Sequence, residues 1–271
     1  MKERIIAVLL ALVIVGAPTC IGLHIAERQV EARLAKEQTA IEEAQQLAAQ
    51  WQDDLFLRSS AEAQQLASDL VHHAERTKAD RLAAIYAAGI PMYVDLEYWR
   101  GQCKDVVGYI YNPGTAISYP IVRGTDNDYY LYRDLYGNHD INGTIMLDYN
   151  NPTDFSDGNN LLYGHNMNAG NMFASLCGYK QQSYFDAHPT MYLYTFGQTY
   201  RIDLFAGFPC PHDGEIFYTS LTQDKVTRFK NQSTFVSPVE PDNSRVLTLV
   251  TCSYEHENWR YVVLGNMVPI G

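Results

Sequence analysis

The pattern of apolar and polar positions divides the chain into three segments, and the first is a continuous apolar run. Residues 5–23 contain no charged side chain, and Lys2 and Arg4 precede them. A helix of this length spans about 28 Å at about 1.5 Å per residue, close to the thickness of the bilayer core. We therefore expect a membrane anchor in residues 1–23, with the amino terminus in the cytoplasm. A cleaved signal peptide is the alternative, but its apolar core is normally shorter and no clear cleavage motif follows.

The second segment, residues 24–89, has a helical pattern. Glycine and proline are absent from residues 24–88, where Ala, Gln, Glu, Leu and Arg predominate. Leu47, Trp51 and Leu55 recur at helical spacing, which indicates an amphipathic stripe. We interpret the segment as a helical stalk that separates a domain from the membrane. A coiled-coil dimerisation element is the alternative, although the heptad is irregular.

The third segment, residues 90–271, has an apolar period near two. Turn residues, such as those at 112–114, separate eight runs rich in Tyr, Val, Ile, Leu and Thr. The predicted strands are residues 106–111, 116–122, 144–147, 160–164, 190–195, 199–208, 246–251 and 260–267, and helical insertions are predicted at 128–135, 171–179 and 222–235. Eight short strands in a domain of this size predict a mainly β fold, an eight-stranded barrel with peripheral helices.

Composition narrows the function classes. The net charge of −11 and the pI near 5.1 argue against a nucleic-acid partner, which would require a basic face. No glycine-rich phosphate loop is present, and no cysteine or histidine pair has the spacing of zinc ligands. We therefore expect neither a cofactor nor a metal. Five cysteines are too few for a disulfide-rich scaffold.

Two predicted strands end in residues that can carry chemistry. His165 follows an apolar run at the start of a Gly/Asn-containing loop, and Cys252 ends a run that strongly favours a strand. Arg260 begins the next strand. A thiolate is a strong nucleophile, an imidazole can transfer protons, and a guanidinium can stabilise an oxyanion. Together these residues indicate nucleophilic catalysis by a cysteine.

These motifs resemble those of the sortases, and specifically of class B. The matching segments are 162–167 (LYGHNM) and 248–252 (TLVTC), followed by Arg260 in a strand-forming context. Residues 108–110, 114–122 and 126–131 are similar to the family's early strands and the helix that follows. The helix predicted at 222–235 is similar to the insertion that separates class B from class A. The resemblance extends over residues 106–267.

The resemblance implies a membrane-anchored cysteine transpeptidase outside a Gram-positive type of cell, with the sortase β-barrel in residues 90–271. Cys252 would attack a sorting signal near the carboxyl terminus of a secreted protein and form a thioacyl-enzyme. An amine of a cell-wall precursor or of a pilin would then resolve it. His165 would be the general acid and base, and Arg260 would hold the oxyanion or the substrate backbone. The substrate-binding positions carried over from the family are Asn127, Leu131 and Thr251.

One departure from the family pattern concerns substrate choice. Class B sequences often have serine two residues before the nucleophile, where this chain has Val250. We expect a sorting signal of the Asn-Pro type.

Two other functions remain open from the residues alone. A hydrolytic cysteine protease of the papain type also needs cysteine and histidine, but in the opposite order, and its asparagine has no obvious candidate here. A catalytically silent surface-binding protein would have no need of all three residues.

The remaining cysteines are expected to be structural. Cys20 lies in the anchor. We expect Cys103, Cys177 and Cys210 to be free, buried thiols. A Cys103–Cys177 or a Cys177–Cys210 disulfide is the alternative outside the cell.

Overall fold

The structure is a computed structural model and describes residues 68–73, 76, 83, 85 and 87–270. The predicted anchor and most of the predicted stalk lie outside these residues, and residues 68–73 are helical. Within the described residues, no helix is both long and apolar enough to cross a membrane. Leu96–Ile270 belong to one compact unit, and the described residues before Leu96 belong to another.

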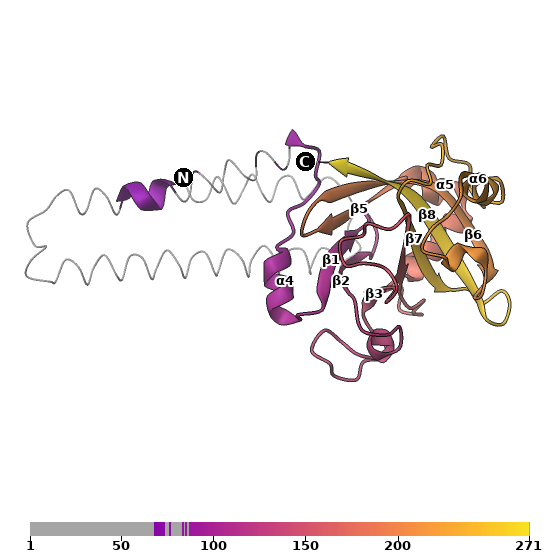
Figure 1. The fold of residues 1–271 in the computed structure, drawn as a ribbon, viewed down its shortest axis with the longest axis horizontal. Helices are drawn as coiled ribbons and strands as arrows, with labels where there is room; N and C mark the ends of the chain where they lie inside the picture. Colours follow the sequence, from indigo (N-terminus) through magenta and orange to yellow (C-terminus); the bar gives the residue numbers. More distant parts are fainter. Residues whose placement is uncertain (1–67, 74–75, 77–82, 84, 86, 271) are drawn as a thin grey trace, which may run out of the picture. The chain divides into compact units, whose positions relative to one another are not determined.

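Eight strands of the compact unit form a closed barrel (Figure 1). The order around the barrel is β1-β2-β3-β4-β7-β8-β6-β5, and β5 closes the ring by pairing with β1. Only the β2/β3 and β4/β7 pairs are parallel. The strands are β1 Val106–Tyr111, β2 Ser118–Val122, β3 Ile145–Leu147, β4 Asn159–Tyr163, β5 Thr190–Thr195, β6 Thr199–Pro211, β7 Val246–Cys252 and β8 Trp259–Ile270. The predicted eight-stranded β-barrel is therefore confirmed.

The strands around the predicted catalytic residues are buried on both faces. Leu249 and Val263 belong to the main core cluster, which fills the barrel. The alternate residues Val250 and Val262 belong to a second cluster with Phe229 on the outer face. Successive side chains of a strand point to opposite faces of the sheet. Because both faces are buried here, these strands are nearly continuous apolar runs in the sequence. The alternation also decides which residues at the strand ends share a face.

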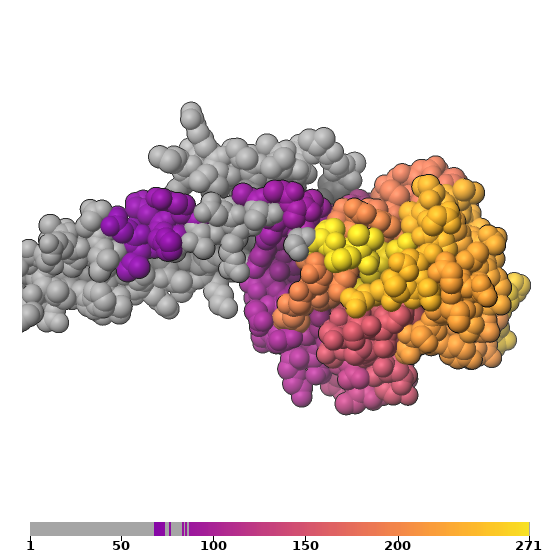
Figure 2. Space-filling view, turned by 45° about the horizontal axis from the view of Figure 1, so that its top comes forward, coloured from indigo at the N-terminus to yellow at the C-terminus, as the bar shows by residue number. Residues whose placement is uncertain are grey.

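Short helices cover parts of the barrel, and Figure 1 shows α6 beside β6. They are α4 Leu96–Gln102, the 3-10 turn η1 Tyr129–Tyr132, the 3-10 segment η2 Ala174–Lys180, α5 Gln182–Ala187, η3 Glu215–Phe217 and α6 Gln223–Asn231. Thr222 begins α6, because its hydroxyl accepts a hydrogen bond from the amide of Lys225 at 3.4 Å. In the space-filling view, yellow atoms near the carboxyl terminus reach the surface of the unit, in agreement with the exposed Pro269 (Figure 2).

The helix predictions need correction. The helix predicted at 128–135 is only the four-residue turn η1, because Arg133 is already extended, with φ −136° and ψ 144°. The insertion predicted at 222–235 is helical only over Gln223–Asn231. The sequence reading missed α4, α5 and η3, which are too short to show a clear helical period.

Candidate active site

Cys252 and Arg260 lie opposite each other at one end of the β7/β8 pair. They are cross-strand Cα partners, and the amide of Ser253 donates to the carbonyl of Trp259 at 2.9 Å. Directly opposed residues of an antiparallel pair project from the same face. Cys252 is two residues beyond Val250, and Arg260 is two residues before Val262, so both project from the outer face. The register therefore brings the predicted nucleophile and the predicted cation side by side.

His165 reaches the same end of the barrel from β4, which runs parallel to β7. Tyr163 pairs with Val250, and the amide of Gly164 donates to the carbonyl of Val250 at 3.1 Å. Gly164 is required here, since a Cβ at this position would lie 2.5 Å from Cδ1 of Ile145. The close packing fixes the chain immediately before His165, next to the end of β7.

The ring of His165 is oriented by a backbone carbonyl. Its Nε2 lies 2.7 Å from the carbonyl oxygen of Leu131, which can only accept a hydrogen bond. Nε2 therefore carries a proton in either charge state, and Nδ1 is the nitrogen that can take up or release one. The ring of Tyr132 packs beside the imidazole, with 5.4 Å between ring centroids. The 3-10 turn η1 thus determines which nitrogen of His165 exchanges a proton.

Asn166 links the histidine loop to the nucleophile. Its amide nitrogen Nδ2 donates to the carbonyl oxygen of Cys252 at 2.9 Å and contacts the sulfur of Cys177 at 3.4 Å. The hydroxyl of Tyr254 donates to the carbonyl oxygen of Asn166 at 2.8 Å. These contacts hold the β4 and β7 ends together. Sequence reading missed this role, although Asn166 lies inside the motif around His165.

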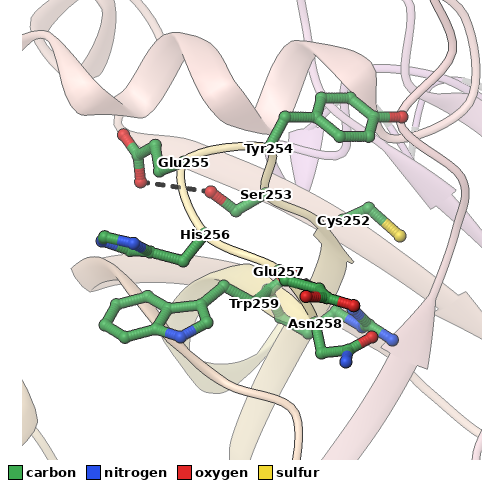
Figure 3. Close-up of a pocket in the computed structure, with 9 residues that line it drawn as sticks. Cys252, Ser253, Tyr254, Glu255, His256, Glu257, Asn258 and Trp259 are labelled. Carbon is green, nitrogen blue, oxygen red and sulfur yellow. Dashed lines mark hydrogen bonds between the residues drawn. The ribbon is translucent and has the colours of Figure 1, made fainter.

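A hollow of about 490 Å³ lies at the β7–β8 turn and is lined by Cys252–Arg260 (Figure 3). Figure 3 shows the Cys252 sulfur and the Tyr254 ring on one side of the turn, and Glu255 and His256 on the other. Glu255 also forms a 3.1 Å salt bridge with Lys180. The hydrogen bond from Lys180 holds the pKa of Glu255 below its ordinary value. The turn beside the nucleophile is thus tied to η2.

Burial distinguishes the four described cysteines, all of which are free, as expected. Burial raises the pKa of Cys210 to about 12, although the charge of Arg260 opposes this shift. Cys177 is half-buried, not buried as expected, and the burial that it has raises its pKa. Cys103 is buried, and its sulfur lies 3.4 Å from the hydroxyl of Tyr130. Cys252 is half-buried and lines the hollow, so among these four thiols it is the one at an open site.

The three predicted substrate-binding residues have different surroundings. Asn127 is half-buried, and its Nδ2 donates to Oδ2 of Asp148 at 3.0 Å. Leu131 is half-buried beside His165. Thr251 is 2% exposed, and its hydroxyl donates to the carbonyl of Gly164 at 2.8 Å. The structure thus brings Leu131 to the predicted catalytic residues, whereas the Thr251 side chain lies between β7 and β4. The substrate roles of all three stay predictions.

Two further polar residues at the site were missed from sequence. The hydroxyl of Tyr163 donates to Oδ2 of Asp148 at 2.8 Å, and Asp148 is 6% exposed. Burial and the Asp148 carboxylate both raise the pKa of Tyr163, and the nearby Arg260 partly opposes them. The alternation of side chains along β3, continued by one residue to Asp148, would have placed Asp148 on the outer face of the barrel. In the described part of the chain, no cluster of three or more His, Cys, Asp and Glu side chains could hold a metal.

Comparison with known proteins relates this site to one family. A family model described as "Sortase domain" matches residues 110–268. Sortase B of Listeria monocytogenes is 37% identical over 174 residues, which cover 61% of this chain and 70% of that protein. Sortase B of Staphylococcus aureus is 27% identical over 175 residues, 62% of this chain and 72% of that protein. The solved S. aureus sortase B–substrate complex superposes with a TM-score of 0.61 and 27% identity over 65% of this chain and 85% of that one.

Proposed function

Because the chain belongs to the sortase family and resembles its class B members, we propose that this cysteine transpeptidase uses Cys252, His165 and Arg260 to join secreted proteins to a surface amine. The sulfur of Cys252 attacks the backbone carbonyl carbon of a sorting signal. The carbon–nitrogen bond breaks, the carboxyl-terminal fragment leaves as an amine, and a thioester remains on the enzyme. An incoming amine then attacks the thioester, forms a new amide and frees the thiol.

The other two residues have complementary tasks in this reaction. Nδ1 of His165 gives a proton to the departing amine and later takes one from the incoming amine. Arg260 stabilises the negative oxygen of each tetrahedral intermediate, because its guanidinium remains charged. In the described part of the chain, Arg260 has no carboxylate partner, and its one hydrogen bond is from Nη1 to the carbonyl of Trp259 at 3.1 Å. Most of its donors are therefore open to a substrate.

The observation that carries this proposal is the meeting of three strand ends. Cys252 and Arg260 are direct cross-strand partners, and β4 delivers His165 beside the end of β7 with its Nε2 already bound to a carbonyl. Their order in the chain, histidine before cysteine, differs from that of the papain type. A silent binding protein would not require a histidine with one nitrogen fixed and the other left to exchange protons.

We propose an Asn-Pro type of sorting signal as the substrate. The S. aureus relative has been solved as a substrate complex, which supports a substrate-binding site in this class. Asn127, Leu131 and Thr251 are the residues assigned to that site. The acceptor is proposed to be an amine of a cell-wall precursor or a pilin.

The proposed location is the outer face of the cell membrane. Residues 5–23 would form a single span, with the amino terminus in the cytoplasm and the barrel outside. Fractionation of cells that produce the chain without residues 1–23 tests this assignment. We expect the shortened protein in the soluble fraction, and retention on membranes would refute the anchor.

The catalytic proposal is tested with the full chain purified in detergent. Fluorogenic peptides of the Asn-Pro type are cleaved with and without a short glycine peptide as the amine, and mass spectrometry follows the thioester and the products. Cys252→Ala should abolish cleavage, whereas Cys103→Ala, a control at a buried cysteine, should retain it. Cleavage by Cys252→Ala at the wild-type rate would refute the nucleophile. Hydrolysis that the amine never converts to transfer would support the protease alternative.

Arg260→Lys is the matched test of the oxyanion assignment. It retains a positive charge but loses the guanidinium fork, so we expect kcat to fall about 10- to 100-fold. Turnover equal to that of the wild type would remove Arg260 from the proposed mechanism.

A further inference from the structure

Tyr254 has an exposed ring whose far end is held by a hydrogen bond. It lies two residues after Cys252 on the β7–β8 turn, and its side chain is 74% exposed. Its hydroxyl donates to the carbonyl oxygen of Asn166 at 2.8 Å, in the loop that begins at His165. The side chain is therefore fixed at both ends, by its own backbone and by its hydroxyl, while most of the ring faces solvent.

The nucleophile belongs to the same small network. Nδ2 of Asn166 donates to the carbonyl oxygen of Cys252 at 2.9 Å. Asn166 thus bonds to Tyr254 through its carbonyl and to Cys252 through its side chain, and the backbone of Ser253 joins those two residues. This closed circuit fixes the position of the Tyr254 ring relative to the Cys252 backbone.

Burial does not account for the Tyr254 ring, but its place at the site does. A tyrosine stabilises a fold mainly through the area that it buries, and Tyr261, which is fully buried, does so here. Tyr254 instead lines the hollow of about 490 Å³ together with Cys252. Figure 3 shows its ring on the same side of the turn as the Cys252 sulfur. The nucleophile therefore has an aromatic wall beside it.

An aromatic wall of this kind suits an apolar group of a ligand. Ligand pockets are lined largely by apolar and aromatic side chains. A tyrosine offers a large contact area at a small entropic cost, because only two torsions must be fixed. The hydroxyl bond of Tyr254 holds the ring before any ligand arrives.

We propose that the Tyr254 ring determines specificity for the substrate residue whose carbonyl Cys252 attacks. The ring receives the apolar part of that residue's side chain, such as the methyl groups of valine. The inference rests on the proposed function of Cys252. Acylation brings the carbonyl carbon of this residue to the sulfur, so its side chain lies beside the groups that line the hollow with Cys252.

Kinetics with a matched pair of peptides test the contact. The two peptides are of the Asn-Pro type and differ only in the residue before the scissile bond, which is valine or glycine. We expect the full wild-type chain to favour valine, and Tyr254→Ala to lower the valine-to-glycine ratio of kcat/KM about 3- to 10-fold, the range expected for an aromatic contact. Tyr254→Phe keeps the ring and should lower the ratio less than about 2-fold. An equal loss of kcat/KM for both peptides would show a merely structural role and overturn the inference, as would an unchanged ratio.

Phe196→Ala is the control at an exposed ring remote from the site. Phe196 is 37% exposed on the turn between β5 and β6. It lies near Thr199, at the end of β6 that pairs with Ile270, whereas the other end of β6 pairs with Trp259 beside Arg260. We expect Phe196→Ala to leave the valine-to-glycine ratio unchanged. A fall equal to that of Tyr254→Ala would overturn the inference, because the effect would then not require a ring at the hollow.

A second readout does not depend on turnover. Benzyl and methyl methanethiosulfonate both modify Cys252, and mass spectrometry of the Cys252 peptide gives the two rates. An apolar wall beside the sulfur favours the benzyl reagent, so we expect Tyr254→Ala to lower the benzyl-to-methyl rate ratio about 3- to 10-fold and Phe196→Ala to leave it unchanged. An unchanged ratio in Tyr254→Ala would refute the wall. Absence of peptide transfer by the wild type would refute the proposed function instead, and the reagent ratio would still decide whether the ring forms an apolar site at Cys252.

Discussion

Gly143 supports the carbonyl that orients His165, and Gly143→Ala should therefore damage catalysis from a distance. Its φ is +59°, and a Cβ there would overlap the Leu131 carbonyl oxygen and lie 2.8 Å from that of Tyr130. These backbone atoms cannot rotate away as a flexible side chain would. The Leu131 carbonyl is also the acceptor for Nε2 of His165. The substitution should displace that carbonyl and release the imidazole.

The expected loss of unfolding free energy in Gly143→Ala has two contributions. A left-handed conformation costs a non-glycine residue about 1–2 kcal/mol, and forcing an atom into packed surroundings costs about 1–3 kcal/mol more. Gly170 is the matched control, because its φ is +82° and a Cβ there meets nothing within 4 Å. Gly170→Ala should lose only the first contribution, about 2–8 °C in Tm for a domain of this size. Gly143→Ala should lose the second as well.

The assay combines thermal unfolding with peptide-transfer kinetics below both transitions. Loss of the bond to His165 should lower kcat of Gly143→Ala about 10- to 100-fold, since a hydrogen bond to a charged group contributes about 1.5–3 kcal/mol. Gly170→Ala should retain kcat within about 3-fold. Equal kcat values for the two folded variants would refute the role of the Leu131 carbonyl in orienting His165.

Three further predictions concern the thiols, the turn and the barrel wall. Iodoacetamide at neutral pH should modify Cys252 well before Cys210, whose pKa near 12 keeps it protonated, and peptide mapping would show the opposite order if the burial argument is wrong. Glu255→Gln should lower stability by about 0.2–1 kcal/mol at neutral pH and low salt, since the Lys180 hydrogen bond lowers the pKa of Glu255 from 4.5. A carboxyl group whose pKa is lowered by folding stabilises the folded state at pH values above its unfolded pKa. The difference in unfolding free energy between the wild type and Glu255→Gln should therefore vanish as the pH falls below about 4.5 and through the folded pKa. A difference that persists at that pH contradicts the assignment. Asn159→Ala should cost about 2–5 kcal/mol by urea unfolding, because Asn159 is fully buried with three side-chain bonds, and a loss under about 1 kcal/mol would be inconsistent with this.

The strands could be predicted because their signal is local. The run at 246–251 consists of β-branched and apolar residues, and β7 occupies Val246–Cys252. Short helices could not be predicted with the same success. The segment at 128–135 was predicted to be a helix, but contacts with distant residues accompany only a turn: the Tyr130 hydroxyl donates a hydrogen bond to Asp105, and the Thr144 amide donates one to the Tyr130 carbonyl. Tertiary contacts override weak local propensity in such segments.

The residues of the candidate site also differ in whether local sequence predicts them. His165, Cys252 and Arg260 were predictable because each stands at the end of a strand-forming run in a motif that resembles a known family. Tyr163 and Asp148 were not, since a tyrosine in an apolar strand and an aspartate before a turn are usually structural. Their meeting depends on the register of β3 and β4, where Met146 pairs with Tyr163, and local sequence does not specify that register.

The sequence by itself determined the eight strands of the barrel, the acidic composition and the three residues proposed to carry the chemistry. These follow from period-two patterning, net charge and short motifs, all of which are properties of neighbouring residues. Only the tertiary structure decided that Thr251 faces the β4 backbone while Cys252 projects outward, and that the Leu131 carbonyl fixes the proton on Nε2 of His165. The physical reason is that strand pairing and side-chain alternation set which distant groups meet, and a hydrogen bond exists only where they do.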